Sequence, residues 1–580
     1  MKKKLWLLLA VIVAAMVFTT ACVTDEDEDQ QGEKVYRASW TGDLTSLNAH
    51  ANVSTLVSDL YVFVHSGLFQ RVPGADRMSS MIVPDIAAAP PIQIDEWTWH
   101  IPIREEARWH NGTPIDAHTL EFSYRMLLCP VLRNPMSNFM FAGAIDIANG
   151  RDFFVQGQEG NDPVDWADVG ITAIEDHLLE IRTIQRWTQE DVMRHFLDRS
   201  TFPVYPELYE YLICDCCGEE SMYGTSLDTI MFAGPFFFDT WVQDALHIYT
   251  RNHDHWMTEW FHFDRVEIRI VPDRNARVQL WEQGELDLLG LDAVLLPIWR
   301  FDPRVRSAPT VSPIHIDINC RNYENPLLSN RYFRRALLFA MDRVTIADLA
   351  GGQRPAPYYV NYDAMAGTIQ FRSTPEARAN ELPNYGFNPE LALEYFEKAL
   401  ADVGVESGWV RMSFGETHAT YTLIAQFLEQ ELPAIFGADR FEVRLDPTPP
   451  GWARDYVNNP TQYELHFVSW GSTASRVMPF RAFEFVVSTY PEPMRPAPII
   501  IPEFDEVYYR AATEEARLNP QLMIELTAEL ERLHMYHVMQ VVLYQGRSHT
   551  LHSNRLILPV DQHVPALGWG VRFADIDLSR

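Results

Sequence analysis

Histidine and cysteine clusters are the first candidates for chemistry in this chain. His253 and His255 are two residues apart and would share one face of a strand, a geometry that suits a metal ion. Cys214, Cys216 and Cys217 form a second cluster, but no further Cys or His pair follows at zinc-finger spacing. Exposed polar histidines, and a disulfide formed locally or with a distant cysteine, are the alternatives. We expect no metal site and no cofactor.

Motifs for catalysis are absent from the sequence. It contains no G-x-S-x-G nucleophile elbow, no H-E-x-x-H pair and no glycine-rich phosphate loop. An acid pair for glycoside hydrolysis cannot be picked out among 79 Asp and Glu residues. We therefore expect a protein that is not an enzyme. A secreted carbohydrate-active hydrolase is the alternative.

The composition narrows the class of protein further. The chain has 580 residues, of which 47% are hydrophobic and 22% charged, so it is globular and too long for one hydrophobic core. Two or more lobes are expected. The formal net charge is −32, and it becomes −35 once the three lysines at positions 2–4 are lost with the leader. Such a surface repels nucleic acid and anionic lipid, so we expect no nucleic-acid partner.

The first residues carry targeting information. Residues 2–4 are positive, residues 5–18 form an apolar run of fourteen, and a small-residue cleavage site precedes Cys22. The run is shorter than the ~20 residues that a membrane span needs. Its end resembles a bacterial lipobox, with Thr19 where that pattern most often has Leu, and this implies a lipid on Cys22. An ordinary secretory signal cut near Ala21 is the alternative.

The leader and the residues after it are expected to lie outside the fold. Residues 1–22 are predicted to be a lipoprotein signal peptide. Positions 25–29 are five consecutive acids that cannot pack, so residues 23–33 are predicted to be a solvated tether. The mature chain is therefore expected to be extracytoplasmic, on the periplasmic or outer face, and lipid-anchored to the cell membrane.

The local structure of segment 314–357 can be predicted most clearly from the sequence. Ile314, Ile316 and Ile318 alternate with polar residues, as in a half-buried strand. A turn at Asn325 follows and leads into a helix with one apolar stripe. The stripe comprises Phe333, Ala336, Leu337, Ala340 and Met341, and the other face carries Arg331, Arg334 and Arg335. The segment is expected to end at Gly351 and Gly352, which suit a left-handed cap.

Patterns elsewhere predict strands joined by helices. Alternating apolar residues indicate strands over 410–414 and 441–445, and the helix between them has apolar residues over 423–428. Because parallel strands need such a crossover, we expect a parallel sheet in the second half of the chain. A helix is predicted over about 56–69, and a hairpin over 236–251.

Five pieces of the sequence, taken in order, resemble one family. They are 97–128, with its core His110-Asn111-Gly112-Thr113-Pro114, then 234–236, 251–256, 271–287 and 319–357. They are similar to the "F-x-D-G-x-P", "GPY", "RNPDYW", "GEID" and "RVRxALxxAIDR" signatures of the family 5 extracellular solute-binding proteins. These are the oligopeptide- and dipeptide-binding lipoproteins of ABC importers. The resemblance runs from about Val35 to the C-terminus.

The resemblance implies a mixed α/β protein with the two-lobed fold of periplasmic binding proteins. Residues 34–301 and 541–580 would form a large lobe with an extra subdomain at about 75–222. Residues 302–540 would form a second lobe inserted between hinge strands, and the lobes would close over a ligand. The implied function is that of a monomeric substrate-binding component, which delivers peptides or a related polar solute to ABC permease subunits. A receptor for extracellular peptide signals is a further alternative.

The resemblance also implies a ligand site with one departure. Peptides in this family pair with protein strands beside a Trp, and an Asp three residues later binds the α-ammonium group. Here the run is Trp470, Gly471, Ser472 and Thr473, so Thr473 stands where the carboxylate would be. Without it a buried ammonium loses a hydrogen bond worth about 1.5–3 kcal/mol. Either another acid supplies the charge, or the ligand is a blocked peptide, an oligosaccharide or another polar organic molecule.

Other candidate ligand contacts lie outside this run. Trp40, Asn48 and His50 are in the first strand and loop, which face the cleft in the family, and Asn319 ends the strand that enters the second lobe. Trp470 can equally be a core aromatic residue, and Asn48 and Asn319 can bond their own turns. The net charge favours neutral or cationic ligands by electrostatic steering.

Overall fold

The protein divides into two compact units, Met1–Glu33 and Lys34–Arg580, and every element below belongs to the second. The computed structural model describes residues 32–51, 55–141, 146–157, 161–213, 221–310, 313–320, 324–367, 369–449, 463–469, 478–489, 499–564 and 567–580. Within these ranges, no helix is both long enough and apolar enough to cross a membrane.

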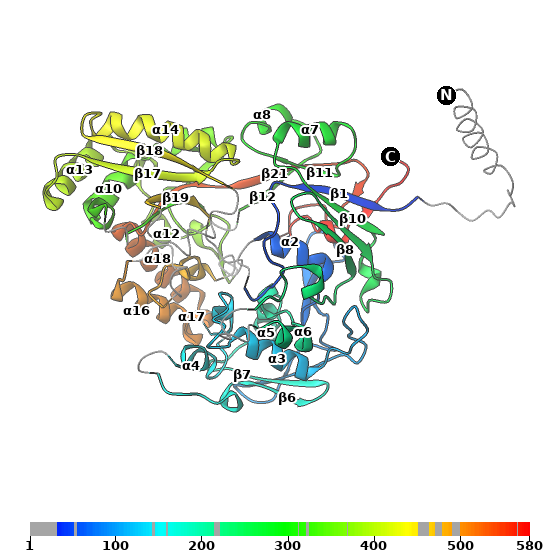
Figure 1. Ribbon diagram of the computed structural model, residues 1–580. Coiled ribbons are helices and arrows are strands. Elements are labelled where there is room, and N and C mark those ends of the chain that lie inside the picture. Colours follow the sequence, from blue (N-terminus) through cyan, green and yellow to red (C-terminus); the bar gives the residue numbers. More distant parts are fainter. Residues whose placement is uncertain are drawn as a thin grey trace, which may run out of the picture. The chain divides into compact units, whose positions relative to one another are not determined.

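The first strand joins a sheet that is built mainly from residues 200 positions later. Its strand order is β1 (Val35–Trp40), β10 (Arg265–Ile270), β9 (Leu246–Arg251) and β8 (Phe236–Val242) (Figure 1). β1 runs parallel to β10, whereas β10, β9 and β8 are antiparallel. The predicted hairpin over 236–251 is therefore confirmed.

A smaller antiparallel sheet lies within residues 92–182. Its order is β4 (Ile92–Gln93), β5 (Thr98–Pro102), β7 (Leu178–Arg182) and β6 (Ile171–Glu175). The helix α3 (Ala117–Leu127) packs on β6 and β7. Asp116 begins this helix, because its Oδ1 accepts a hydrogen bond from the Thr119 N–H at 2.7 Å.

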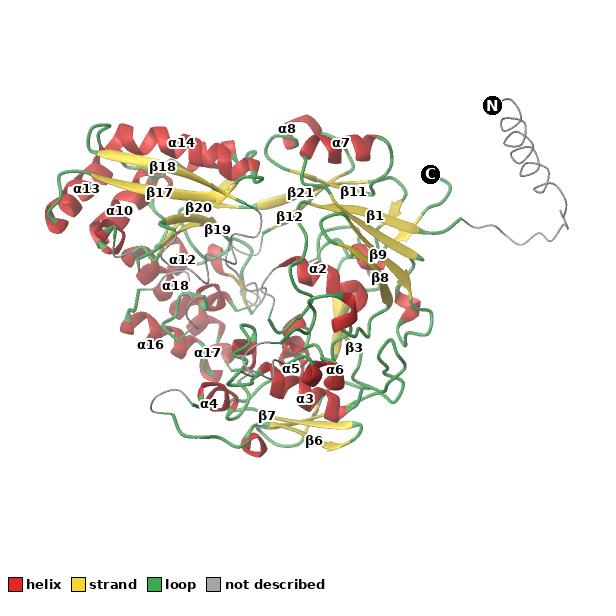
Figure 2. Ribbon diagram, in the orientation of Figure 1, coloured by secondary structure: helices red, strands yellow, loops and turns green. Residues whose placement is uncertain are grey.

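The second half of the chain contains a six-stranded mixed sheet. Its order is β14 (Arg354–Pro355), β20 (Gln540–Gln545), β13 (Ile314–Ile318), β19 (Leu465–Val468), β17 (Gly408–Gly415) and β18 (Phe441–Thr448). β17 and β18 are parallel and joined by α14 (Ala419–Phe436). The predicted βαβ unit is thus confirmed, and Figure 2 shows helices and strands mixed in this region.

The segment 314–357 differs from its prediction in several respects. β13 and the apolar stripe form as predicted, with Phe333, Ala336 and Leu337 buried. The strand is not half-buried, because His315 and Asp317 between the isoleucines are 0% exposed. The helix, however, is split into α10 (Arg331–Ala340) and α11 (Arg343–Leu349). Asp342 causes the break, because its side chain accepts hydrogen bonds from the N–H groups that begin α11.

Arg334 is a correction to the predicted polar face of α10. Its residue is only 4% exposed, whereas the pattern placed it with surface arginines. The guanidinium donates to the Ser329 carbonyl at 2.6 Å and to the His537 carbonyl at 3.2 Å. Both carbonyls lie at helix C-termini, where a cation is favourable, so burial of this arginine is compensated.

Helices surround this sheet, and a three-stranded sheet adjoins it. The helices are α9 (Pro326–Ser329), α12 (Pro375–Arg378), α13 (Pro389–Val403), α16 (Pro502–Ala511), α17 (Glu514–Leu518) and α18 (Pro520–His537). The adjoining sheet has the order β11 (Leu288–Leu291), β21 (Arg547–His552) and β12 (Val305–Pro309), all antiparallel. β12 continues toward β13, and β20 continues through Gly546 into β21, so two chain segments cross between these sheets.

The predicted helix over 56–69 is shorter than expected. α2 (Thr55–Val64) ends before Gly67, and Phe69 begins β2 (Phe69–Pro73), which pairs with β3 (Ser80–Pro84). A Cβ on Gly67 would lie 2.5 Å from Phe202, so the chain needs glycine where it leaves the helix. The remaining described helices and strand pairs are α4 (Gly150–Val155), α5 (Gln189–His195), α6 (Pro206–Tyr211), α7 (Arg274–Glu282), α8 (Leu296–Trp299), β15 (Met365–Ala366) with β16 (Ile369–Gln370), and β22 (Leu556–Ile557) with β23 (Asp575–Ile576).

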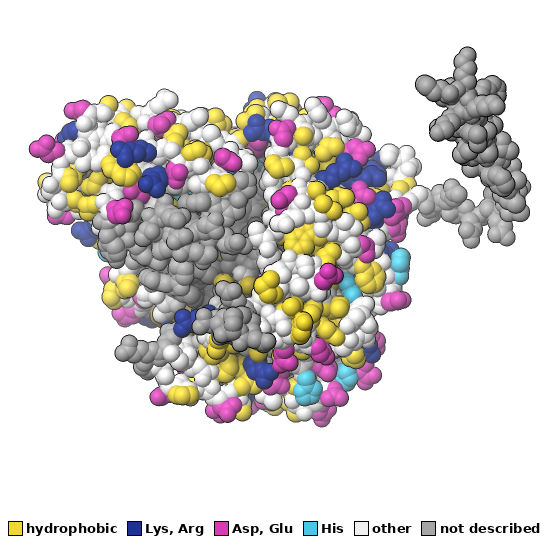
Figure 3. All heavy atoms as spheres, viewed as in Figure 1, with side chains coloured by type: hydrophobic (Ala, Val, Ile, Leu, Met, Phe, Trp, Pro, Cys, Tyr) yellow, Lys and Arg dark blue, Asp and Glu magenta, His cyan; other side chains and the backbone are white. Residues whose placement is uncertain are grey.

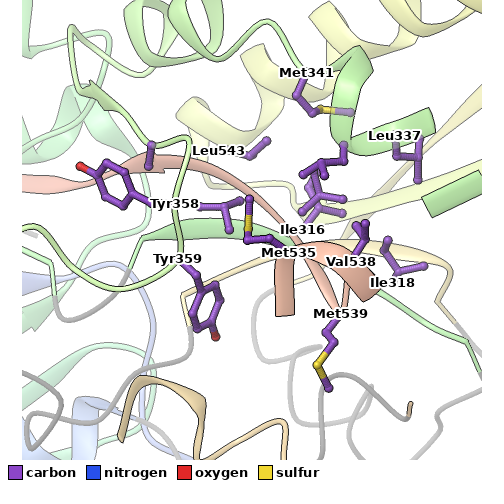
Figure 4. Packing of buried hydrophobic residues seen from close by; sticks show 14 of the residues in the cluster. Ile316, Ile318, Leu337, Met341, Tyr358, Tyr359, Met535, Val538, Met539 and Leu543 are labelled. Atoms are coloured by element: carbon purple, nitrogen blue, oxygen red, sulfur yellow. The ribbon is translucent and has the colours of Figure 1, made fainter. Parts of the chain in front are cut away.

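Buried apolar side chains form separate clusters. The N-terminal cluster includes Tyr36, Leu60, Phe236 and Ile576; the small-sheet cluster includes Phe69, Ile101, Leu120 and Phe196; the six-stranded cluster includes Ile316, Leu337, Val410 and Leu543; and a small one includes Trp281 and Leu551. In the six-stranded cluster, Figure 4 shows Ile316 and Ile318 among side chains from α10 and the end of α18. Each region therefore has a core of its own.

Candidate ligand-binding site

One cavity brings together residues from distant parts of the chain. Its volume is about 1210 Å³. Small-molecule pockets typically measure ~300–1,000 Å³, so this one has room for a ligand larger than a single amino acid. The wall includes residues of β1, α2, β2 and β21, of the segments 194–202 and 478–485, and of the C-terminal segment at Val564 and over 567–572.

The cavity lies where three separately packed regions meet. Tyr36 in its wall belongs to the N-terminal cluster, Phe69 to the small-sheet cluster and Met478 to the six-stranded cluster. Because these cores are separate, a shift of one region against another would change the cavity without unpacking any of them.

Aromatic side chains of β1 and α2 form one part of the wall. Tyr36 is stacked on Phe263 with ring centroids 5.1 Å apart, and Trp40 meets His247 edge to face at 5.3 Å. Tyr61 is fixed by a hydrogen bond from its hydroxyl to a backbone carbonyl of the loop after β1. These contacts hold the rings in place in the protein alone, so this part of the wall is preformed.

The wall also carries charged side chains of both signs. They are Arg71, Arg194, Arg199, Arg481 and Arg572, with Asp59, Asp85, Asp198 and Glu484. Cations and carboxylates are therefore nearly balanced here, although the whole chain has a net charge of −32. Acidic side chains are spread over the outer face shown in Figure 3. Ligand preference must therefore follow from individual groups in the wall rather than from the net charge.

A buried ion pair, Arg481 with Glu484, forms the wall beside the six-stranded cluster. The Arg481 Nε atom lies 2.7 Å from Glu484 Oε2, and the two side chains are 4% and 8% exposed. Burial by itself would lower the pKa of Arg481, but the Glu484 carboxylate outweighs it and raises that pKa. Both groups are therefore charged and occupied with each other.

Asp85 is enclosed in the wall next to the C-terminal segment. Burial raises the pKa of its carboxyl to about 6, even though Trp256 Nε1 donates to it at 2.8 Å. Desolvation lowers the pKa of Arg572 to about 10, and the nearby Asp85 charge partly offsets this. The two groups stabilise each other inside the protein.

The wall histidines are neutral at physiological pH. Burial lowers the pKa of His65 to about 3 and that of His195 to about 3. Asp59 has the opposite behaviour: its side chain is exposed to the cavity, yet the surrounding protein raises its pKa to about 6. Charge in this part of the wall therefore comes from arginines and carboxylates.

The residues predicted to contact a ligand fall in different places. Trp40 ends β1 and lines the cavity. Asn48 is 2% exposed, and its Oδ1 accepts the His50 N–H at 3.0 Å, a contact that caps its own turn. His50 is fully buried, and burial lowers its pKa to about 4. Asn319 is also buried, and its Nδ2 donates to the Tyr463 carbonyl at 2.9 Å.

Several predictions concern residues outside the described ranges. Trp470, Gly471, Ser472 and Thr473 lie there, as does the lipidation residue Cys22. Of the ligand contacts proposed from sequence, the structure thus places Trp40 at the cavity. Asn48 caps its own turn, while the side chains of His50 and Asn319 contact the backbone carbonyls of Phe202 and Tyr463 in distant segments.

Sequence patterns did not single out the charged wall residues. Asp59 stands in an otherwise apolar helix, TLVSDLYVFV, and a lone acid in such a run is a detectable signal. Arg481 and Glu484 stand in the apolar run MPFRAFEFVV at i and i+3, and that spacing is another. The arginines of α5 and the C-terminal segment have no comparable local signal, because only the fold brings them to the cavity.

The candidate metal groups are not gathered into a site in the described part of the chain. His253 is exposed, and His255 is 4% exposed and stacked on Trp256 with centroids 4.0 Å apart. Among described residues, no group of three or more His, Cys, Asp or Glu could hold a metal ion. Cys129 is a free thiol, the Cys320 thiol donates to the Leu328 carbonyl at 3.3 Å, and Cys214, Cys216 and Cys217 lie outside the described ranges.

Two known proteins are similar in sequence to this chain over part of their length. The dipeptide-binding protein DppE of Bacillus subtilis is 28% identical over 205 residues, which cover 35% of this chain and 33% of DppE. The periplasmic oligopeptide-binding protein OppA of Escherichia coli is 23% identical over 393 residues, which cover 63% of this chain and 65% of OppA. The chain thus spans about a third of one relative and just under two thirds of the other.

A solved structure shows the fold of the chain, and a family description shows its family. The substrate-binding domain of an oligopeptide ABC transporter from Bacillus anthracis matches with a TM-score of 0.80 at 17% identity, covering 94% of this chain and 99% of that one. This likeness confirms the predicted two-lobed α/β fold. The description of the bacterial extracellular solute-binding proteins, family 5, matches residues 81–486, well over half of the chain. The chain therefore belongs to family 5 of the bacterial extracellular solute-binding proteins.

Proposed function

We propose that this protein is the substrate-binding component of an ABC importer and that it captures peptides, or a related polar solute, in the cavity. The observation that carries the proposal is the wall of the cavity, which combines three separately packed regions of a family 5 chain. Both DppE and OppA are named for peptide binding. The protein would bind without chemistry of its own.

Closure of two lobes would trap the ligand. We assign the large lobe to residues 34–301 and 541–580, with a subdomain at about 75–222, and the second lobe to 302–540. The six-stranded cluster is confined to residues 314–544, which supports this division except at residues 541–544 of β20, since these pack in that cluster although they are assigned to the large lobe. No member of the other clusters lies inside that range.

The hinge would lie where the two chain segments cross between β12, β13, β20 and β21. There the Thr310 N–H donates to the Gly546 carbonyl at 3.0 Å, and the Thr310 hydroxyl donates to the same carbonyl at 3.1 Å. The chain segments β12–β13 and β20–β21 are the connections between the assigned lobes in this part of the fold. A small rotation at Thr310 and Gly546 would move the lobes with little loss of packing.

Ser66, His255 and Asp85 lie together as in a catalytic triad, but their hydrogen bonds do not suit hydrolysis. Ser66 Oγ lies 3.2 Å from His255 Nε2, but the Met257 N–H donates to His255 Nδ1 at 3.1 Å. The proton of the neutral imidazole is therefore on Nε2, which donates to Ser66, and the Ser66 hydroxyl bonds to Asp85. A histidine in this state cannot accept the serine proton, so Ser66 is not activated as a nucleophile.

Mass spectrometry of the purified protein tests the proposed function. Native spectra should show one bound peptide or polar solute per chain, and denaturation should release it. The same preparation should leave peptide and glycan libraries unchanged after long incubation. Sustained accumulation of cleaved product would refute the binding role in favour of the hydrolase alternative.

We further propose that the mature protein is extracytoplasmic, monomeric and anchored through a lipid on Cys22, and that it delivers ligand to permease subunits. The leader pattern and the extracellular family support this. Metabolic labelling with a palmitate analogue should mark the wild-type chain and not Cys22→Ala. An unlabelled wild-type chain cut near Ala21 would show an ordinary secretory signal instead.

A further inference from the structure

Asp59 is the wall carboxylate that lacks a partner. It lies on α2, and its side chain is exposed to the cavity. Throughout the described ranges, no hydrogen bond or ion pair to this side chain is present, and its pKa reflects only the enclosure by the protein. The question is therefore which group completes its interactions.

The other carboxylates in the wall are already bonded. Asp85 accepts from Trp256 Nε1 at 2.8 Å, and Asp198 accepts from the backbone N–H two residues later at 2.9 Å. Glu484 is paired with Arg481 at 2.7 Å. Asp59 thus differs from its neighbours in the wall in having no bond of this kind.

The five arginines in the wall are engaged with other groups, and the charge that acts on Arg199 is that of Asp198. Arg194 bonds to Glu190 at 2.5 Å, and Arg71 donates to Ser80 Oγ at 3.2 Å. Arg572 donates to the Arg71 carbonyl at 2.8 Å, and Arg481 holds its glutamate. None of these described cations neutralises Asp59, so its charge faces the space that a ligand would occupy.

The surroundings of Asp59 favour a cation over an uncharged polar group. A carboxylate that is largely enclosed and unpaired gains most from a positive partner, since a charge-assisted hydrogen bond is about twice as strong as a neutral one. The rings of Tyr36 and Trp40 are also part of this wall, and ring faces attract cations. Asp59 is close enough to Tyr36 to contribute, after burial and Asp287, to the raised pKa of that hydroxyl.

We propose that Asp59 binds an organic cation of the ligand, either an ammonium or a guanidinium group, through a charge-assisted hydrogen bond. This inference rests on the proposed function, because it assigns the chemistry of one group in the same cavity. Preferred ligands would carry a free amino terminus or a basic side chain. Uncharged blocked peptides and oligosaccharides would leave Asp59 unpaired and bind more weakly.

Calorimetry with Asp59→Asn tests the proposal. The probes are three mixtures of tri- to pentapeptides: one with free amino termini, one N-acetylated without Lys, Arg or His, and one N-acetylated with a single Lys. Agmatine, which has both cationic groups, is the small-molecule probe, scored by its effect on the melting temperature. Asp244→Asn is the matched control, since Asp244 is an exposed acid in the β8–β9 turn, outside the cavity wall.

Asp59→Asn should weaken binding of the cationic peptides by about tenfold to a hundredfold and leave the uncharged mixture unchanged. The two cationic mixtures separate an amino terminus from a basic side chain as the source of the cation. Equal binding by wild type and Asp59→Asn, or binding of only the uncharged mixture by wild type, would overturn the inference while peptide binding stands. If wild type binds no peptide but agmatine stabilises it through Asp59, the peptide proposal fails and the cation site stands. If agmatine also has no effect, both fail.

Discussion

The buried ion pair between Arg372 and Glu531 joins parts of the six-stranded cluster that are far apart in sequence. The two side chains are 1% and 0% exposed, and Glu531 also accepts the Tyr359 and Val360 N–H groups at 2.9 and 2.8 Å. Removing one partner of such a pair leaves an unpaired charge in the interior. Glu531→Gln should therefore lower the free energy of unfolding by about 3–5 kcal/mol in urea denaturation.

Glu529→Gln on the same helix is the control for this prediction. Glu529 pairs with Arg532 at 2.7 Å, but both side chains are more than a third exposed. Exposed pairs contribute about 0–1 kcal/mol, so this change should be close to neutral. If the two variants were equally stable, the pair at Glu531 would not carry the stability assigned to it.

Between β20 and β21 there is little space for a side chain on Gly546, so we expect that adding one methyl group there destabilises the protein. A Cβ on Gly546 would approach Thr310 Cγ2 to 2.8 Å, which is closer than van der Waals contact. Gly546→Ala should therefore cost about 1–3 kcal/mol in thermal or urea unfolding, and adding Thr310→Ala should restore most of it.

Gly290→Ala in β11 is the control for the crossing. A Cβ there would meet nothing within 4 Å, and the residue lies in the three-stranded sheet that contains β21, the strand that follows Gly546. It should leave stability nearly unchanged. If Thr310→Ala did not restore the stability lost in Gly546→Ala, the contact between these two residues would not be the cause of the loss.

α17 is bonded to the start of α5 through one arginine. The Arg517 guanidinium lies 3.7 Å from the centroid of the Trp187 ring and 3.7 Å from Asp191 Oδ2, and it donates to the Arg186 carbonyl. Ala516 beside it belongs to the six-stranded cluster and Trp187 to the small-sheet cluster, so the contact joins two cores. It would stabilise the closed arrangement of the proposed lobes.

Arg517→Ala should speed ligand release by about five- to thirtyfold, because a partly buried cation–π contact and ion pair are together worth about 1–2 kcal/mol. Stopped-flow displacement measures the rate, and small-angle scattering of the ligand-free protein should show a larger radius of gyration. Arg510→Ala, an exposed arginine at the end of α16, is the control. Unchanged release in Arg517→Ala would mean that the contact does not hold the lobes closed.

The whole protein should be sensitive to acid because many histidines are buried in the neutral form. Burial lowers the pKa to about 3 or about 4 for His50, His65, His195, His255, His315, His466, His534 and His552. The unfolded chain protonates histidine near pH 6.5, so below that pH it binds more protons than the folded chain and stability falls as pH falls. Each such histidine costs about 2 kcal/mol at pH 5 relative to pH 7.

Buried carboxyls oppose this effect in part. Burial raises the pKa of Asp85 and that of Asp146 to about 6, so between about pH 4 and 6 the folded state binds more protons at these sites. The histidines are more numerous, and the urea midpoint should be lower at pH 5.0 than at pH 7.5. An unchanged or higher midpoint at pH 5.0 would contradict the neutral burial of the histidines.

The elements that could be predicted from the sequence are those with a local pattern. The alternation of Ile314, Ile316 and Ile318, the hairpin over 236–251 and the parallel strands around α14 all depend on spacing within one segment. Two predicted helices had wrong bounds. At Asp342 the side chain caps a new helix and so divides the predicted one. Near Gly67 one apolar run contains both the end of a helix and the start of a strand.

The site was less predictable because distant segments build it. Trp40 was found through family resemblance, whereas Asn48, His50 and Asn319 are polar residues that hold backbone in place. Asp59 stands out as a lone acid in the apolar sequence of α2, but its enclosure by distant segments could not be predicted from that sequence. Burial of polar groups is a property of the assembled fold and not of local spacing.

Titration of peptide into a cavity-blocked variant tests the central claim, that the ligand binds in the cavity. Ser39→Trp would place an indole ring in the cavity beside β1 and obstruct the ligand, and Ser579→Trp places the same ring at the exposed C-terminus. Calorimetry should give one peptide bound per chain for wild type and Ser579→Trp and none for Ser39→Trp, with all three melting at similar temperatures. Undiminished binding by a folded Ser39→Trp protein would contradict the account.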